Sequence, residues 1–394
     1  MVFIFDSHPV QYKAPVYQWI QKMKPGVVQV IYVSDCSVRG YRDKEFGSVV
    51  AWDTPLLSGY QNRVLNNERG VPLNGFRSLT GHGIFRLLKK EKPSAVLLSQ
   101  FLYEADMVTY LSCLWLGIPI WIRHETQDEA FSRSRWKTTL RGFFYRLAYR
   151  SISHAFYVGQ LNREHLLRHG VPENRLSLSA YCAVSPSSPL SHESKVSHRV
   201  ALRSELGIKP EETMVLFSGK LIEKKNPELI LQALKKMSSE EADRLKVVFV
   251  GSGDLEDLLK SMSASMKNKV FFAGFVNQSK IADYYLAADI LILPSRKAGE
   301  TWGLVVNEAL QAGCSVVMTK AVGCHREFEG WERVRVIRNE DAEECAEAIK
   351  DLSKLVRAFD WCERQMERYS PRAAAEAIVR QIDEIEPDMP GASQ

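Results

Sequence analysis

Apolar runs alternate with segments of helical spacing along almost the whole chain, and the alternation occurs in both halves. The runs are continuous rather than mixed with polar residues, which is typical of parallel strands covered by helices on both faces. A chain of 394 residues is also too long for one ordinary core. The sequence therefore predicts an α/β fold of two Rossmann-like lobes with parallel sheets. The expected strands are residues 27–33, 95–98, 120–123 and 155–158 in the first half and 214–217, 247–250, 270–273, 290–293 and 315–319 in the second.

The boundary between the lobes is expected in a stretch rich in Ser and Pro. Residues 185–198 lack a hydrophobic period and have the composition of an interdomain linker. A last helix is expected after Ser370, because Pro371 is tolerated in a first helical turn. The sequence predicts an N-terminal domain over residues 1–188, a C-terminal domain over 189–369 and a terminal segment over 370–394.

Composition indicates a globular enzyme of the cytoplasm. Hydrophobic residues make up 45% of the chain and charged residues 25%, the usual globular mix. The seven Cys form no CxxC pair and no metal-finger spacing, which indicates reduced thiols. Residues 1–6 are expected to form a first strand rather than a signal peptide, because no basic region precedes the apolar residues. The apolar run 107–122 is broken by Gly117 and Pro119 and is too short to span a bilayer.

Two carboxylates lie eight positions apart where a strand is expected to lead into a helix. Glu300 belongs to a Gly-rich loop after the expected strand 290–293, and Glu308 lies inside the helix that begins near Leu304. Free backbone N–H groups at a helix N-terminus attract anions, and Gly303 lets a ligand approach the backbone closely. A carboxylate suits such a site only if the ligand also carries hydroxyls. A nucleotide sugar carries both phosphates and hydroxyls.

This arrangement resembles the glutamate–seven residues–glutamate motif of retaining glycosyltransferases of the GT-B fold, family 4 (glycosyl transferases group 1) in particular. Further segments resemble that family in its order and spacing over roughly residues 213 to 325. The N-terminal half is similar more loosely. The segments that carry the resemblance are 215–227, 247–253 and 270–276 in the second half and 6–12 and 157–164 in the first.

Membership in this family would imply two Rossmann-like lobes facing a central cleft, with the acceptor on the N-terminal lobe and the donor on the C-terminal lobe. The last helix would cross back to the N-terminal lobe. Lys220 and Lys225 would neutralise the donor diphosphate together with N–H groups near Gly303. Glu300 would bind sugar hydroxyls, and Glu308 would bind the ribose. The donor-binding set that the resemblance implies is Gly219, Lys220, Lys225, Phe275, Val276, Glu300, Thr301, Trp302, Gly303, Leu304 and Glu308.

One candidate catalytic residue comes from the first half. Arg123 and His124 follow an expected strand, and ligands of open α/β sheets bind beyond the carboxyl ends of strands. The family often has a histidine near this position that touches the donor sugar, which favours His124. The expected catalytic set is therefore Glu300, Lys225, Lys220 and His124.

The expected reaction needs neither metal nor cofactor, and the nucleotide-sugar donor is a co-substrate. No Asp-x-Asp follows a strand in the second half, so the lysines would replace a cation. UDP is favoured over GDP, and the acceptor would be a glycan, a lipid-linked molecule or a small molecule. The anomeric configuration would be retained because the acceptor hydroxyl attacks from the leaving-group side, with the phosphate as base.

The sequence departs from the family pattern at several positions, and two alternatives also stay open. Thr301 and Trp302 replace the commoner glycine and phenylalanine, and Lys220 replaces an arginine. A lysine forms no bidentate fork, so donor affinity is expected to be lower. The alternatives are a sugar-nucleotide epimerase of the same fold and a non-catalytic nucleotide-sugar-binding partner of a membrane glycan complex.

Residues 130–163 contain seven Lys or Arg, no Asp or Glu, and interleaved aromatic residues. Such a segment fits a peripheral contact with an anionic membrane, here the inner membrane face, or else a solvated basic face. The net charge of +5 is too small to predict a nucleic-acid partner. His165 and His169 lie four apart on an expected helix without the glutamate of a zinc-protease motif, so they are expected to be two exposed histidines.

Overall fold

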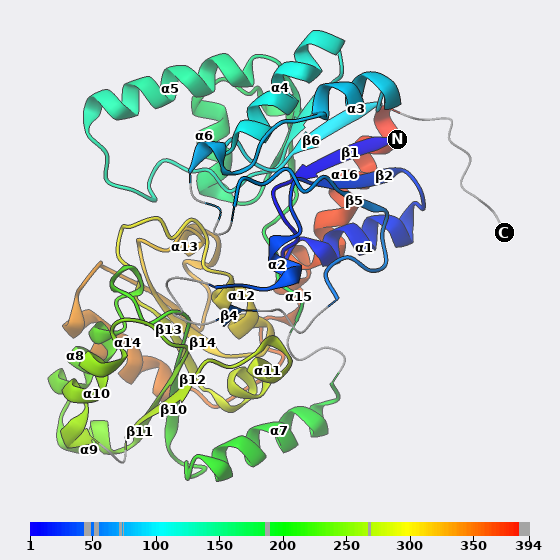
Figure 1. Ribbon diagram of the computed structural model, residues 1–394. Coiled ribbons are helices and arrows are strands. Elements are labelled where there is room, and N and C mark those ends of the chain that lie inside the picture. The colour runs from blue at the N-terminus through cyan, green and yellow to red at the C-terminus, as the bar shows by residue number, and fades with distance from the viewer. Residues whose placement is uncertain are drawn as a thin grey trace.

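The computed structural model describes residues 1–42, 49–50, 55–70, 73, 75–185, 190–266 and 269–385. They form two lobes, the N-terminal one uppermost in Figure 1. Each lobe is built on a parallel sheet, as the continuous apolar strands predict, so the prediction of a two-lobed GT-B fold is confirmed. The predicted boundary between residues 188 and 189 lies outside the described residues.

The N-terminal sheet has seven strands in the order β5-β2-β1-β6-β7-β8-β9, and every neighbouring pair is parallel. The chain runs outward from β1 in both directions, which sends its connecting helices to opposite faces of the sheet. A separate antiparallel pair joins β3 and β4. The strands are β1 Val2–Asp6, β2 Val28–Tyr32, β3 Tyr41–Arg42, β4 Val49–Val50, β5 Asn62–Val64, β6 Ala95–Leu98, β7 Ile120–Ile122, β8 Ile152–Tyr157 and β9 Leu176–Leu178.

The C-terminal sheet has six parallel strands in the order β12-β11-β10-β13-β14-β15. Its central strands β10 and β13 are almost wholly buried, in keeping with their continuous apolar sequence. The strands are β10 Thr213–Ser218, β11 Leu245–Val250, β12 Val270–Gly274, β13 Ile290–Leu293, β14 Ser315–Thr319 and β15 Val334–Ile337.

Helices cover both faces of each sheet and bury four apolar clusters against the strands. In the N-terminal lobe, one face carries α3 Ile84–Glu91, α4 Glu104–Leu116, α5 Arg135–Tyr149 and α6 Gln160–Arg168, and the other carries α1 Ala14–Met23. In the C-terminal lobe, one face carries α7 His192–Glu205, α11 Gln278–Ala287, α12 Leu304–Gln311 and α15 Glu363–Met366, and the other carries α8 Glu228–Lys236, α10 Glu256–Met262 and α14 Ala342–Ser353. Shorter helices are α2 Cys36–Arg39, α9 Ser239–Asp243 and α13 His325–Phe328.

The last helix, α16 Pro371–Ile385, lies against α1 of the N-terminal lobe (Figure 1). Its buried face of Ala374, Ala377 and Ile378 completes the cluster beneath α1. Residues 386–394 of the predicted terminal segment lie outside the described residues. Helical structure starts at His192, inside the segment expected to be a linker, because the Ser191 hydroxyl accepts the Ser194 N–H as an N-cap.

Among the described residues, no helix has both the length and the apolar composition needed to cross a membrane.

Candidate active site

A cleft of about 570 Å³ separates the two lobes at the carboxyl ends of their sheets. Gln11 and Tyr12, in the turn before α1, line it from the N-terminal lobe. The C-terminal wall is formed by the turns after β10, β11 and β12 and by the start of α12. Of the residues predicted to bind the donor, five line this cleft, namely Gly219, Phe275, Val276, Leu304 and Glu308.

Two glycines let the carboxyl ends of β10 and β11 come together below the cleft. Gly251 has φ +129°, and a Cβ there would lie 1.9 Å from the carbonyl oxygen of Gly219. No side chain fits that space, so glycine is required at Gly251. The turn after β11, which belongs to a segment that carries the family resemblance, thus forms part of the cleft wall.

Glu308 reaches the cleft from the second turn of α12. Its two carboxylate oxygens accept hydrogen bonds from the Tyr285 hydroxyl (2.6 Å) and the Gln278 side-chain amide (3.4 Å). Burial raises the pKa of the Glu308 carboxyl, and the bonds from Tyr285 and Gln278 act in the opposite direction. The carboxylate is therefore held in place by protein groups and still borders the cavity.

Gly303 places the start of α12 close to the neighbouring strand. Its φ is +102°, and a Cβ there would lie 2.8 Å from the side chains of Leu293 and Val322. A larger residue would push the helix N-terminus away from β13. Glycine at this position therefore fixes where the unpaired N–H groups of α12 lie.

The structure brings together two predicted site residues that are distant in sequence. The Lys225 ammonium lies 2.5 Å from Glu300 Oε2, and the Ser295 hydroxyl donates to the same oxygen at 3.2 Å. The Lys224 ammonium also fixes the loop that carries Glu300, because it donates a hydrogen bond to the Gly299 carbonyl at 2.9 Å. Glu300 and Lys225 thus form an ion pair beside the turn that leads into α12.

Trp302 faces the N-terminal lobe and not the cleft. Its indole N–H donates to Asn307 Oδ1 at 2.9 Å, and its ring packs 5.5 Å from the ring of Tyr181. A Cβ on Gly159 of the N-terminal lobe would lie 2.4 Å from the Trp302 ring, so the lobes touch here. The side chain of Trp302 is committed to packing between the lobes, and Thr301 precedes it in the same loop.

The other predicted residues also lie off the cleft lining, as do Glu300, Lys225, Thr301, Trp302 and Gly303. Lys220 is half-buried in the turn directly after Gly219, one residue from the cavity. Arg123 is buried, and its guanidinium donates to Ser179 and to the Ala180 carbonyl. Arg123 therefore braces β7 against the segment that follows β9.

His124 begins a buried chain of hydrogen bonds in the N-terminal lobe. Its Nδ1 accepts from the Thr126 N–H, and its Nε2 lies 3.0 Å from the Tyr149 hydroxyl, which lies 3.0 Å from His165 Nε2. His165 Nδ1 lies 2.9 Å from Asp128 Oδ1. Burial lowers the pKa of His124 to about 3, so this imidazole is neutral near pH 7.

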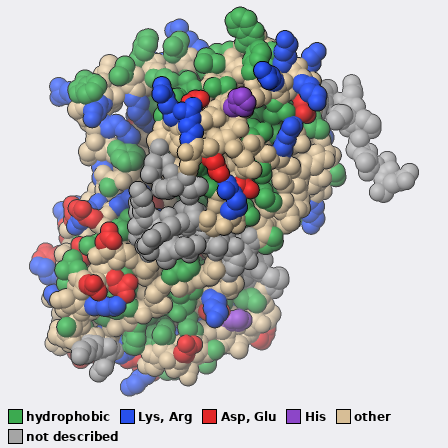
Figure 2. Space-filling view, in the orientation of Figure 1, with side chains coloured by type: hydrophobic (Ala, Val, Ile, Leu, Met, Phe, Trp, Pro, Cys, Tyr) green, Lys and Arg blue, Asp and Glu red, His purple; other side chains and the backbone are tan. Residues whose placement is uncertain are grey.

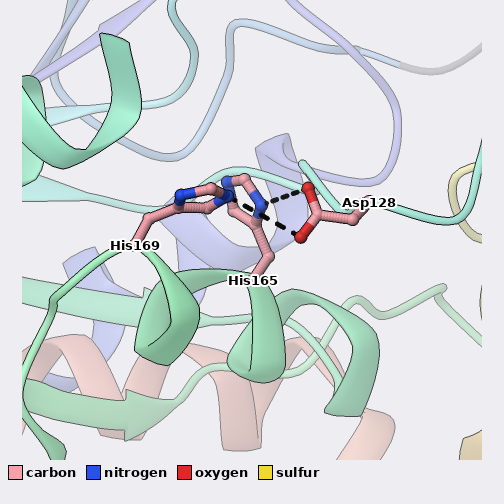
Figure 3. A group of neighbouring side chains, drawn as sticks. All are labelled: Asp128, His165 and His169. Atoms are coloured by element: carbon pink, nitrogen blue, oxygen red, sulfur yellow. Dashed lines mark hydrogen bonds and ion pairs between the residues drawn. The ribbon is translucent and has the colours of Figure 1, made fainter. Parts of the chain in front are cut away.

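His165 and His169 are both buried, so their interpretation as two exposed histidines is wrong. His165 projects from α6 and His169 from the residue directly after it, and both point toward Asp128, as Figure 3 shows. Asp128 also accepts hydrogen bonds from Arg141 (2.6 Å) and Arg168 (2.8 Å). Although burial acts to raise it, bonding to His165 and Arg141 holds the pKa of the Asp128 carboxyl below its usual value.

In the described part of the chain, the possible ligand atoms of Asp128, His165 and His169 all lie within 4.8 Å of one another. They are close enough to hold a metal ion. Both Asp128 oxygens are already paired with arginine guanidinium groups, whose charges would oppose a bound cation. The arrangement therefore suits a buried ion network that anchors α5 and α6 to the loop after β7.

The family model for glycosyl transferases group 1 matches residues 199–365. The C-terminal lobe is a glycosyl transferases group 1 domain. An uncharacterised glycosyltransferase of Methanocaldococcus jannaschii is 34% identical over 127 residues, covering 32% of each chain. The alpha-monoglucosyldiacylglycerol synthase of Streptococcus pneumoniae is 35% identical over 118 residues, covering 29% of this chain and 26% of that protein. The matches thus span about a third or less of these two relatives.

The fold of the whole chain is similar to that of solved structures. Anabaena HepE in complex with UDP superposes with a TM-score of 0.65 over 98% of both chains, at 16% sequence identity. At that identity the likeness concerns the fold alone. It places this group 1 domain in a two-lobed GT-B architecture, with the cleft of about 570 Å³ between the lobes.

Sequence reasoning missed three side chains of the site. Tyr285 and Gln278 position Glu308 from α11, and Tyr12 lines the opposite wall. Tyr12 lies in a segment that carries a loose resemblance, which was the one available signal. Tyr285 and Gln278 sit on a helix of ordinary composition, so nothing in the sequence marks them.

Proposed function

We propose that this protein is a retaining glycosyltransferase that moves a sugar from a nucleoside-diphosphate sugar to an acceptor hydroxyl. The observation that carries the proposal is the Glu308 carboxylate, held by Tyr285 and Gln278 at the edge of a cleft between two GT-B lobes. Glycosyl transfer is favoured over epimerisation because the matching family and both relatives named above are glycosyltransferases. UDP is favoured as the nucleotide, since the similarly folded HepE was solved with UDP.

Each wall of the cleft suits one part of such a donor. The base would lie along Phe275 and Val276, and the ribose hydroxyls would donate to Glu308. The diphosphate would lie over the Gly219 turn and the N-terminus of α12, where backbone N–H groups and the helix dipole favour negative charge. Lys220 and Lys225 would supply the positive charge.

In the proposed site, the Glu300–Lys225 ion pair would link the sugar end to the phosphate end. In the proposed reaction, the bond from the anomeric carbon to the phosphate oxygen breaks, and a bond to the acceptor oxygen forms on the same face. The acceptor proton passes to the departing phosphate. Lys225 would stabilise the charge developing on the leaving group, while Glu300 holds the ammonium and accepts from sugar hydroxyls. No cation is needed if the lysines and the α12 N-terminus carry this charge.

The acceptor would enter from the N-terminal side of the cleft, past Gln11 and Tyr12. A lipid-linked acceptor is favoured by the name of the Streptococcus pneumoniae relative, which synthesises a glycosylated diacylglycerol. We place the reaction at the cytoplasmic side of a membrane.

The decisive experiment incubates the purified protein with a panel of UDP- and GDP-sugars, with and without candidate acceptors. Transfer to an acceptor, or slow release of UDP with free sugar, is the expected result. Proton NMR of the product should show the anomeric configuration of the donor. Conversion of the donor alone into an isomeric nucleotide sugar would establish the epimerase instead. Binding of UDP without any turnover would favour the non-catalytic partner.

A further inference from the structure

One whole face of α5 is apolar and open to solvent. Trp136, Leu140, Phe143 and Leu147 are between 57% and 68% exposed. At 3.6 residues per turn these positions form a single stripe along the helix. The opposite side of α5, which includes Tyr149, packs into the core of the N-terminal lobe. The stripe is therefore left without cover by the described part of the chain.

Helix α4 carries a second group of exposed apolar side chains. Leu111, Leu114 and Trp115 are exposed, Trp115 by 83%, and residues 107–116 contain no charged side chain. The hydroxyl of Tyr110 on α4 lies 3.1 Å from the Ala148 carbonyl of α5, so the two helices are neighbours on the same face of the sheet. We call the seven exposed side chains the α4–α5 ridge: Leu111, Leu114, Trp115, Trp136, Leu140, Phe143 and Leu147.

Basic side chains flank the ridge. By helical geometry, Lys137 lies on one side of the α5 stripe, and Arg135 and Arg146 lie on the other. No acidic residue occurs between Ala130 and Arg163. Figure 2 shows hydrophobic and basic side chains side by side along the upper edge of the molecule, over α4 and α5. Helix α3, packed on α4, adds three further exposed cations, Arg86, Lys89 and Lys90.

We propose that the α4–α5 ridge inserts into the headgroup region of a membrane with an anionic surface. Long basic side chains can keep their charges among lipid headgroups while the aromatic and aliphatic residues between them enter the acyl boundary. Soluble proteins seldom expose so many neighbouring apolar side chains without a partner. A second copy of the chain fits less well, because pairing two α5 helices would bring like charges together, and residues 130–163 contain no acidic residue to pair them.

The loop that precedes α5 links the N-terminal end of this helix to the proposed active site. The loop before α5 reaches the C-terminal lobe, where the Gly299 N–H donates to the Ala130 carbonyl at 2.8 Å, next to Glu300. A bilayer under α5 would therefore lie near the loop that carries Glu300, and it would present a lipid-linked acceptor to the cleft. This last step rests on the proposed function, whereas membrane binding itself does not.

Insertion of apolar side chains changes the effect that salt is expected to have on vesicle binding. The basic segment alone predicts an attachment that high salt abolishes, because screening removes the attraction of exposed charges. Apolar burial is not screened. Binding to anionic vesicles should therefore weaken in high salt without disappearing.

The test uses the full chain and vesicles of phosphatidylcholine alone or mixed with phosphatidylglycerol, with co-sedimentation as the first readout. Brominated acyl chains provide the second readout, since they quench only tryptophans that reach the acyl boundary.

The variants separate the apolar from the basic contribution. The ridge variant is Leu140→Glu with Phe143→Glu. Val200→Glu is the matched control, because Val200 is equally exposed, at 61%, on helix α7 of the other lobe. The charge variant is Lys137→Glu with Arg146→Glu. Arg141 is left intact because it pairs with Asp128.

We expect the wild type and the Val200→Glu control to sediment with anionic vesicles. The ridge variant should bind at least about tenfold more weakly, because it loses the burial of two apolar side chains among the lipids. Brominated lipid should quench the wild type, and Trp136→Phe with Trp115→Phe should lose that quenching. Affinity for UDP should be equal in all variants, which separates failure of this proposal from failure of the proposed function.

Three results would overturn the proposal. The first is wild-type protein that stays in the supernatant with anionic vesicles. The second is sedimentation without any quenching by brominated lipid, a result that needs no variant. The third is a wild-type dimer in light scattering that the ridge variant converts to a monomer while vesicle binding is unchanged, which would assign the ridge to a second copy.

Discussion

Replacing Glu308 by Gln is the sharpest test of the proposed donor site. The substitution keeps the shape of the side chain and leaves an oxygen to accept from the Tyr285 hydroxyl, now 2.6 Å from the carboxylate. It removes the negative charge and turns one acceptor into a donor. A ribose hydroxyl would then lose one charge-assisted hydrogen bond, worth about 1.5–3 kcal/mol. That loss corresponds to UDP binding about 10- to 150-fold weaker.

Isothermal titration calorimetry with UDP measures this directly. Glu343→Gln is the matched control, because Glu343 has a side chain 74% exposed on α14 of the same lobe. Both variants should keep the wild-type melting temperature. An unchanged dissociation constant for Glu308→Gln would remove Glu308 from the site and would take away the main support for a nucleotide in this cleft.

The pH dependence of UDP binding tests the same role of Glu308. Burial raises this pKa, while the bond from Tyr285 lowers it. UDP binding should therefore fall as the pH drops through the raised pKa, because the protonated carboxyl no longer attracts the ribose hydroxyls. Tyr285→Phe removes the opposing bond, so the pH at which binding is half lost should move upward. A midpoint identical to that of the wild type would mean that Tyr285 does not act through Glu308.

Three further outcomes are expected. Lys225→Ala should lower kcat by about 10²- to 10³-fold because the leaving group loses its partner, and Lys220→Ala should act in the same direction; a double variant with wild-type turnover would refute the phosphate assignment. EDTA should leave turnover unchanged, and activity that EDTA removes and Mg²⁺ or Mn²⁺ restores would contradict the metal-free mechanism. Burial lowers the pKa values of His124 and His165 in the folded state, to about 3 for His124. An unfolded chain would protonate both near pH 6.5, so the free energy of unfolding should fall as the pH drops below about 6.5. Urea denaturation at about pH 7.5 and pH 5.5 should show this fall, and His124→Asn should reduce it.

Much of the fold follows from local pattern. The continuous apolar run 290–293 predicts a buried parallel strand, and the structure has β13 at Ile290–Leu293. The edge strands β5, β9 and β15 were not predicted, because half-buried strands at a sheet edge lack a continuous apolar run. The sequence predicts only part of the exposed α4–α5 ridge. Periodicity shows that α5 has an apolar stripe, but a stripe usually faces the core.

The histidines of α6 show where local reasoning fails. Their spacing of four places His165 and His169 on one side of the helix, as the sequence implies. Whether that side meets solvent depends on Asp128, which a loop after β7 brings to them. No local pattern encodes the meeting of two segments of different elements.

The sequence by itself determined the alternating strands and helices, the glycines at Gly219, Gly251 and Gly303, and the placement of Glu308 on the helix after β13. These features depend on short-range sterics and on hydrophobic spacing, which are set by residues close together in the sequence. Only the tertiary structure decided that Lys225 pairs with Glu300 and that Trp302 packs between the lobes. Those outcomes depend on which strands lie next to each other and how the lobes meet, so they arise from packing between segments far apart in the chain.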